Sequence, residues 1–134
     1  MEHNQRFFGV WELEPASCQY SMGVPPKSGK YEIQPEEDTL KFILSWSDEE
    51  RPFLMEFTAI PDGEPHPFAN PALADSMTVG YRDDNILESW SYKDDLCLGY
   101  SKRELIGDGS KMMVSQEVDT ADGKLINRSI YRRV

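Results

Sequence analysis

Apolar and polar residues alternate with a period of two along most of this chain. Residues 39–47 turn large apolar side chains to one face, namely Leu40, Phe42, Leu44 and Trp46. Residues 51–60 repeat the pattern with Phe53, Met55, Phe57 and Ala59. Because side chains alternate between the two faces of a strand, both runs predict half-buried β-strands. Further strands are predicted at residues 7–13, 31–33, 77–81, 86–92, 96–105, 112–118 and 125–134.

Short acidic or glycine-containing segments separate these runs. They are residues 48–50, 83–85, 94–95, 107–109 and 121–123. Asp, Asn and Gly tolerate tight and left-handed geometry, so each segment predicts a hairpin turn. Consecutive hairpins make a meander, which avoids exposed edges most simply by closing on itself. The sequence therefore predicts an all-β fold in which residues 1–134 form a single antiparallel up-and-down β-barrel of about 8–10 strands.

One segment, residues 60–75, breaks the strand rhythm. It contains the prolines Pro61, Pro65, Pro67 and Pro71. Proline cannot donate a backbone hydrogen bond, so we expect a loop without regular strand pairing, and a loop of this length often covers an opening. His66 lies in this loop, where it could serve as a general base or haem ligand above the barrel mouth; the competing interpretation is an exposed loop histidine.

Composition narrows the classes of partner. The formal net charge of -10 argues against nucleic acid and anionic membrane surfaces. Residues 1–6 have no apolar signal core, and no run approaches the roughly 20 apolar residues that span a bilayer, so we expect a cytoplasmic protein without membrane insertion. Cys18 and Cys97 are too few and too far apart for a metal knuckle or redox pair, and are expected to be free thiols. Phosphate-loop, dinucleotide and hydrolase motifs are missing, so no catalytic residue, cofactor or metal is predicted.

Three motifs carry a resemblance to a known family. The first predicted strand opens with Phe7-Phe8-Gly9-Val10-Trp11-Glu12-Leu13, and the last contains Tyr131-Arg132-Arg133. Between them, Lys102-Arg103-Glu104-Leu105 precedes a glycine-containing turn. Together they resemble the intracellular fatty-acid-binding proteins and, more broadly, the calycins, which carry Phe-x-Gly-x-Trp-x-Leu in the first strand, Tyr-x-Arg in the last and Lys-Arg-x-Leu between. The resemblance covers the ends and the last third of the chain, and the middle matches only in strand rhythm.

The resemblance implies roles for individual residues. Trp11 and Arg133 would plug the closed end of the barrel through a cation–π contact worth about 0.5–2 kcal/mol. Arg103 would point inward and hold a ligand carboxylate, unless a register slip turns it outward. The family's second inward arginine is replaced by Ser129, with Arg128 facing outward, so the carboxylate clamp is incomplete. The family's helix-turn-helix lid has no room in residues 14–29, which prolines and glycine interrupt.

The functional hypothesis is non-covalent binding of a small apolar or amphipathic molecule inside the barrel. The candidate ligand-binding residues are Arg103, Tyr131, Ser129, Phe42, Phe57, Met55 and Tyr81. An acidic or oxygenated head group would lie near Arg103, Ser129 and Tyr131; core packing is the competing interpretation for each apolar residue. Two alternatives stay open. A filled barrel could bind a protein partner or form a homodimer through outward apolar residues, Ile43, Leu54 and Ile60, or His66 could support haem binding or lone-base catalysis.

Overall fold

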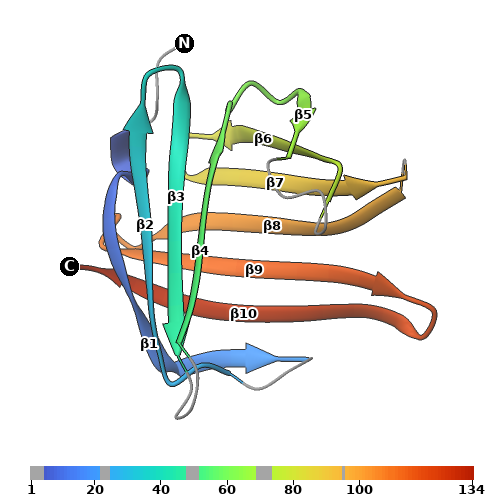
Figure 1. Cartoon of the computed structure of the whole chain (residues 1–134). Coiled ribbons are helices and arrows are strands. Elements are labelled where there is room, and N and C mark those ends of the chain that lie inside the picture. The colour runs from blue at the N-terminus through green and yellow to red at the C-terminus, as the bar shows by residue number, and fades with distance from the viewer. Residues whose placement is uncertain (1–4, 22–24, 48–51, 69–73, 95) are drawn as a thin grey trace.

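The computed structural model of the chain describes residues 5–21, 25–47, 52–68, 74–94 and 96–134. Within them a short 3-10 turn, Gln5–Phe7, precedes ten strands (Figure 1). The strands are β1 (Gly9–Tyr20), β2 (Ser28–Glu36), β3 (Thr39–Ser47), β4 (Pro52–Ala59), β5 (Pro65–Pro67), β6 (Ser76–Asp83), β7 (Ile86–Lys93), β8 (Leu96–Ile106), β9 (Lys111–Thr120) and β10 (Gly123–Arg133). They form one antiparallel sheet in the order β4-β3-β2-β1-β10-β9-β8-β7-β6-β5. The meander thus closes where the first strand meets the last, and the predicted all-β up-and-down barrel is confirmed.

The first strand joins the two halves of the barrel. It pairs with β2 only as far as Glu12, which lies opposite Lys30. The register with β10 then shifts between Glu14 and Gln19, a segment that contains Pro15. Prolines and bulges occur where a strand bends, and Figure 1 shows the second half of β1 leaving β2 and running beside β10. The strands β2–β4 consequently cross β6–β10 at a steep angle, as in orthogonally packed sheets (Figure 1).

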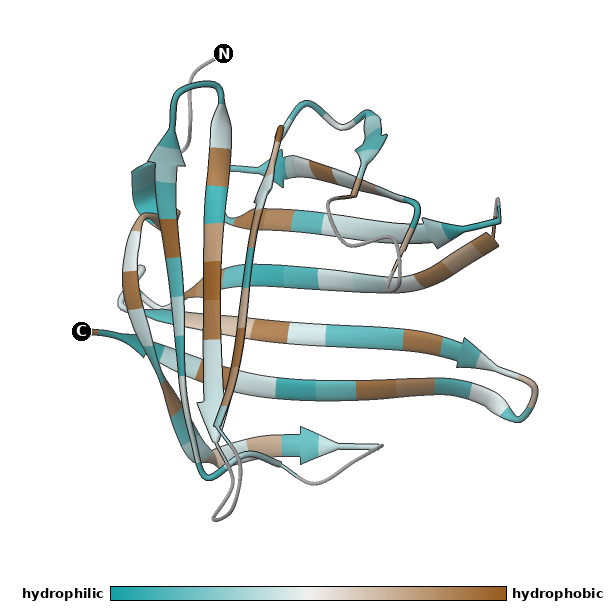
Figure 2. Ribbon diagram, viewed as in Figure 1, coloured by the Kyte–Doolittle hydropathy of each residue, from teal (hydrophilic) through white to brown (hydrophobic). Residues whose placement is uncertain are grey.

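The apolar core gathers around Phe7 and Trp11, at the start of β1. Apolar and polar residues alternate along the strands, as Figure 2 shows. The largest fully buried side chains are Trp11, Phe7, Phe42, Ile33, Leu40, Leu87, Met112 and Val79. Burying each such side chain contributes about 1.5–3 kcal/mol, so this packed end supplies much of the hydrophobic stabilisation.

Arg133 closes the packed end. Its guanidinium carbon lies 4.2 Å from the centroid of the buried Trp11 ring, and one of its Nη atoms donates to the Phe8 carbonyl at 2.7 Å. The Trp11 indole N–H donates to the Phe7 carbonyl at 3.1 Å. Gly9 has a φ of +126°, which strains any other residue, and a Cβ there would stand 3.1 Å from Arg133 Nη1 and displace the guanidinium slightly. The first strand begins at Gly9; Phe7, expected within it, lies in the preceding 3-10 turn.

The expectation that the prolines would prevent strand pairing is wrong for residues 65–67. They form β5, which pairs with β6 at the edge of the sheet, where proline is tolerated. Before β5, the Gly63 amide donates to the Val79 carbonyl at 2.8 Å, and after β5 the Phe68 ring lies 5.7 Å from that of Phe57 in β4. This segment therefore fills the gap between β4 and β6. Residues 69–73, the centre of the predicted loop, and the predicted hairpin turn at 48–50 lie outside the described residues.

In the part of the chain that the structure describes, no helix is long and apolar enough to cross a membrane.

Candidate functional site

A cavity of about 230 Å³ lies inside the barrel, toward the end opposite the Trp11–Arg133 plug. We call it the mouth cavity. Its lining residues are Tyr20, Pro26, Tyr31, Leu44, Trp46, Phe53, Val114, Gln116, Asn127, Ser129 and Tyr131. The barrel is therefore filled at its packed end and hollow at the other.

One wall of the mouth cavity is polar. Asn127, Ser129 and Tyr131 follow one another at every second position of β10, so their side chains share the inward face. Gln116 on β9 and Tyr20 on β1 each lie opposite Asn127 in the neighbouring strands. All five side chains are uncharged hydrogen-bonding groups. Among the described residues that line the cavity, none is charged.

The facing wall is apolar and belongs to β3 and β4. Leu44 and Trp46 come from β3, and Phe53 of β4 lies opposite Trp46. The rings of Trp46 and Phe53 stack, with centroids 5.7 Å apart and planes 18° apart. The same two rings also border a groove where β1 and β2 separate, beside Leu13 and Gly29. They thus stand between the mouth cavity and this lateral groove.

Arg103 lies directly behind the mouth cavity. Its side chain points into the barrel and is 3% exposed. Nε donates to the Tyr31 hydroxyl at 2.7 Å, Nη1 to the Leu87 carbonyl at 3.2 Å and Nη2 to Ser89 Oγ at 2.9 Å. These acceptors are neutral, and no ion pair found within the described ranges includes Arg103. A buried cation without a carboxylate costs free energy, so each of these hydrogen bonds matters for holding it there.

Tyr31 separates Arg103 from the cavity. Because the Tyr31 oxygen accepts a hydrogen bond from the guanidinium, its own O–H is left to donate elsewhere, and Tyr31 lines the mouth cavity. Its ring meets that of Tyr131 edge to face, with centroids 5.7 Å apart. Burial raises the pKa of Tyr131, with smaller contributions from Tyr31 and Tyr20, so the Tyr131 phenol keeps its proton and stays a hydrogen-bond donor.

The structure places the predicted ligand-binding residues in two groups. Ser129 and Tyr131 line the mouth cavity, with Arg103 behind Tyr31. The other four predicted residues, Phe42, Phe57, Met55 and Tyr81, are not part of that lining. Phe42 is fully buried and stacks on Phe57 with centroids 4.9 Å apart, and the Tyr81 ring packs 6.0 Å from that of Phe7. Met55 is half-buried opposite Leu44.

Sequence reasoning missed much of the polar wall. Asn127 lies two residues before Ser129, which was predicted to point inward, so extending the period of two would have found it. Tyr31 and Gln116 lie opposite Leu44 and Asn127 in neighbouring strands, and that register is known only from the structure. Tyr20 follows the register shift in β1, and no parity argument reaches across such a shift.

The residues behind the alternative hypotheses lie elsewhere. His66 Nε2 is 2.8 Å from Asp62 Oδ2, and His66 is not part of the mouth cavity lining. Leu54 is 71% exposed on β4, opposite Ser45. Across the described ranges, no group of three or more His, Cys, Asp and Glu side chains could hold a metal ion.

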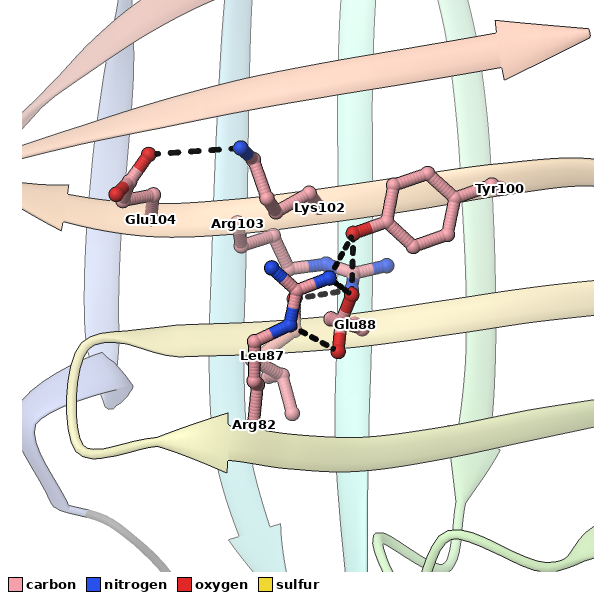
Figure 3. A network of polar contacts seen from close by, with 7 residues as sticks. All are labelled: Arg82, Leu87, Glu88, Tyr100, Lys102, Arg103 and Glu104. Atoms are coloured by element: carbon pink, nitrogen blue, oxygen red, sulfur yellow. Dashed lines mark hydrogen bonds and ion pairs between the residues drawn. The ribbon is translucent and has the colours of Figure 1, made fainter.

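A polar network occupies the outer face of β7 and β8, next to Arg103 but on the other side of the sheet (Figure 3). The Glu88 carboxylate is 5% exposed and accepts hydrogen bonds from Arg82 and from the Tyr100 hydroxyl. Burial, followed by the hydrogen bond to Glu88, raises the pKa of Tyr100 to about 12. The guanidinium of Arg82 supplies the counter-charge that lets this carboxylate be buried.

Comparison with known proteins identifies the fold. No protein-family model and no curated protein sequence matches the chain. Solved structures match over nearly the whole length: a Schistosoma mansoni fatty acid binding protein in complex with arachidonic acid, with 13% identity, a TM-score of 0.63 and 99% of each chain covered. A zebrafish ileal bile acid-binding protein complexed with cholic acid matches with 16% identity, a TM-score of 0.61 and coverage of 96% of this chain and 99% of that one.

A third similar structure is a secretory abundant heat soluble protein of Ramazzottius varieornatus, with 12% identity, a TM-score of 0.66 and 96% of each chain covered. At such identities the likeness concerns the fold alone. The chain has the calycin fold of the fatty-acid-binding proteins. Residues 21–27 connect β1 to β2. The residues of this connection that the structure describes, 21 and 25–27, form no helix.

Proposed function

We propose that the protein binds a small amphipathic molecule non-covalently in the mouth cavity. The main observation in support is that the barrel has a packed end and, at the other end, a cavity of about 230 Å³ with one polar and one apolar wall. A cavity needed only for packing would be filled, because protein interiors reach crystal-like density. Ligand sites, in contrast, are concave, largely preformed and lined by apolar groups with a few placed polar ones.

The structural neighbours support the same class of function. Two of the matching barrels are described as holding arachidonic acid and cholic acid, which are both amphipathic. In this chain the oxygen-bearing head of the ligand would lie near Tyr31, Ser129 and Tyr131, and its hydrocarbon part against Leu44 and the Trp46–Phe53 pair. Arg103 would act behind Tyr31 rather than by direct contact.

The test uses delipidated protein and two environment-sensitive fluorescent probes built on naphthalene. One is the neutral prodan and the other the anionic 1-anilinonaphthalene-8-sulfonate. We expect saturable binding of at least one probe, with a blue-shifted emission, because the probe leaves water for an apolar wall. Native mass spectrometry of the protein from its own host would in parallel identify a co-purifying molecule.

A matched pair of variants locates the bound probe. Gln116→Trp places an indole in the mouth of the cavity, whereas Glu117→Trp places one on the outer face of the same strand. We expect the first variant to lose probe binding by ten-fold or more, on the order of 1.4 kcal/mol, and the second to retain it. Binding that neither variant changes, or no binding at all, would refute the proposal.

A further inference from the structure

The mouth cavity carries its polar groups in a line. Successive inward residues of a strand are separated by about 6.6–6.8 Å, so Tyr131, Ser129 and Asn127 place hydrogen-bonding groups at regular steps along one wall. Ser129 is 5% and Asn127 8% exposed. The Asn127 side chain already has a partner, because its Oδ1 accepts a hydrogen bond from the Ser21 amide at 3.0 Å. Tyr131 keeps an O–H to donate, so a ligand that lies against this wall meets the Tyr131 and Ser129 hydroxyls.

The wall is also uncharged. Among the described residues, the guanidinium behind this wall is that of Arg103, which is covered by Tyr31 and has neutral acceptors for three of its N–H groups. Ser129, at the centre of this wall, is a neutral hydroxyl. A ligand carboxylate in the mouth cavity would therefore lose its hydration without meeting a cation directly. The net charge of -10 adds a further unfavourable potential.

Tyr31 supplies the donor that replaces the cation. Its oxygen accepts from Arg103 Nε at 2.7 Å, which polarises the O–H bond and leaves that hydrogen to donate. Tyr31 adjoins the packed core at the buried Phe42, whose ring it meets edge to face with centroids 6.4 Å apart. It presents a strengthened neutral donor to an acceptor oxygen.

We infer that the mouth cavity selects an uncharged molecule of about bicyclic size, with oxygens toward the polar wall and hydrocarbon on the opposite face, one of whose oxygens accepts a hydrogen bond from Tyr31. This inference rests on the proposed function and adds the ligand class to it. The size follows from the cavity volume of about 230 Å³, which is below the roughly 300–1,000 Å³ of sites for drug-sized ligands.

Three naphthalenes of the same shape test the ligand class by isothermal titration calorimetry of delipidated protein. They are 2-acetylnaphthalene, with a neutral acceptor, 2-naphthoate, with a carboxylate, and 2-ethylnaphthalene, with neither. We expect the ketone to bind about ten-fold more tightly than the carboxylate, because the carboxylate loses its hydration without contacting a cation directly. The ketone should also bind about five-fold more tightly than the hydrocarbon, which accepts no hydrogen bond. A hydroxyl at ring position 6 of the ketone should raise affinity again, by about three-fold, because it meets the next group along the wall.

The variant Tyr31→Phe tests the donor. It should lower the affinity for the ketone about five-fold and change the affinity for 2-ethylnaphthalene by less than two-fold. Retained binding of 2-ethylnaphthalene also serves as the check that the cavity is intact. Tyr92→Phe removes a hydroxyl from a tyrosine outside the cavity lining and should change neither affinity.

The outcomes separate the two proposals. Equal or tighter binding of 2-naphthoate, or an equal loss for all three compounds in Tyr31→Phe, would overturn the inference while the protein remains a small-molecule binder. If none of the compounds binds in a manner that Gln116→Trp abolishes, the proposed function itself fails.

Discussion

At the scale of single residues, two arginines of this barrel have different structural roles. Arg133 closes the packed end with its guanidinium over Trp11 and its N–H groups on backbone carbonyls. Arg103 is buried without a carboxylate and directs its Nε–H to Tyr31. The first arrangement stabilises the closure of the sheet. The second buries a cation, which lowers the stability of the fold, and holds the oxygen of Tyr31 so that the Tyr31 O–H can donate elsewhere. Buried polar groups retained at such a cost are typical of sites that bind something.

Tyr100 is a residue whose effect on stability can be read from pH. Its pKa is raised from 10.0 to about 12, so between these values the unfolded chain releases the phenol proton while the folded chain keeps it. The stabilisation is therefore complete below pH 10 and is lost as the pH rises toward 12. We expect the thermal midpoint, followed by circular dichroism, to fall more steeply over this range in the wild type than in Tyr100→Phe. Equal slopes would contradict the assignment, and the phenolate absorbance of the two proteins provides the independent titration.

Much of the fold was predictable because period-two alternation is a local property. The predicted strand at residues 39–47 coincides with β3, and the predicted turns at 83–85, 107–109 and 121–123 fall at the junctions between strands. The site was less predictable because it depends on where the core stops. Phe42 and Ser129 both point inward, yet one is fully buried in the core and the other lines a cavity. Parity decides which face a side chain takes, and only the three-dimensional packing decides whether another side chain fills the space in front of it.

At the scale of elements, the separation of β1 from β2 is the main departure from a regular barrel. Their pairing ends at Glu12 and Lys30, and the lateral groove begins there. The two strands nevertheless stay close here, since a Cβ on Gly29 would lie 3.4 Å from the Cβ of Leu13. This is near the Cβ separation of about 3.5–4.5 Å that a disulfide requires. The strands therefore diverge in their hydrogen bonding while remaining close together.

The double variant Leu13→Cys/Gly29→Cys, with Cys18 and Cys97 replaced by serine, tests this geometry. We expect the disulfide to form under mild oxidation. The free energy of unfolding, measured in urea, should then be about 3 kcal/mol higher for the oxidised than for the reduced protein, as for a closed loop of about 15 residues. Comparing the two redox states of one variant cancels the loss of the Leu13 side chain. Leu13→Cys/Gly80→Cys serves as the control that should not cross-link. Failure of the first pair to cross-link would show that the strands lie further apart.

At the scale of the whole molecule, acids outnumber bases by 24 to 14. The ion pairs seen between lysine or arginine and glutamate, such as Lys41–Glu56 and Arg132–Glu12, are largely exposed and so contribute little each. The larger electrostatic effect is the repulsion among the excess carboxylates, which is greater in the compact barrel than in the unfolded chain. Screening by salt should therefore favour folding.

We expect the thermal midpoint to rise by a few degrees when NaCl increases from about 0.01 M to about 0.15 M, because the Debye length falls from about 30 Å to about 8 Å. The variant Glu64→Lys/Asp122→Lys changes two exposed acids and takes the net charge from -10 to -6, since each exchange adds two. Its midpoint should be higher at low salt and should respond less to NaCl. If salt instead lowers the midpoint of the wild type, the specific ion pairs outweigh the general repulsion, and the acidic surface contributes to the stability of this barrel rather than opposing it.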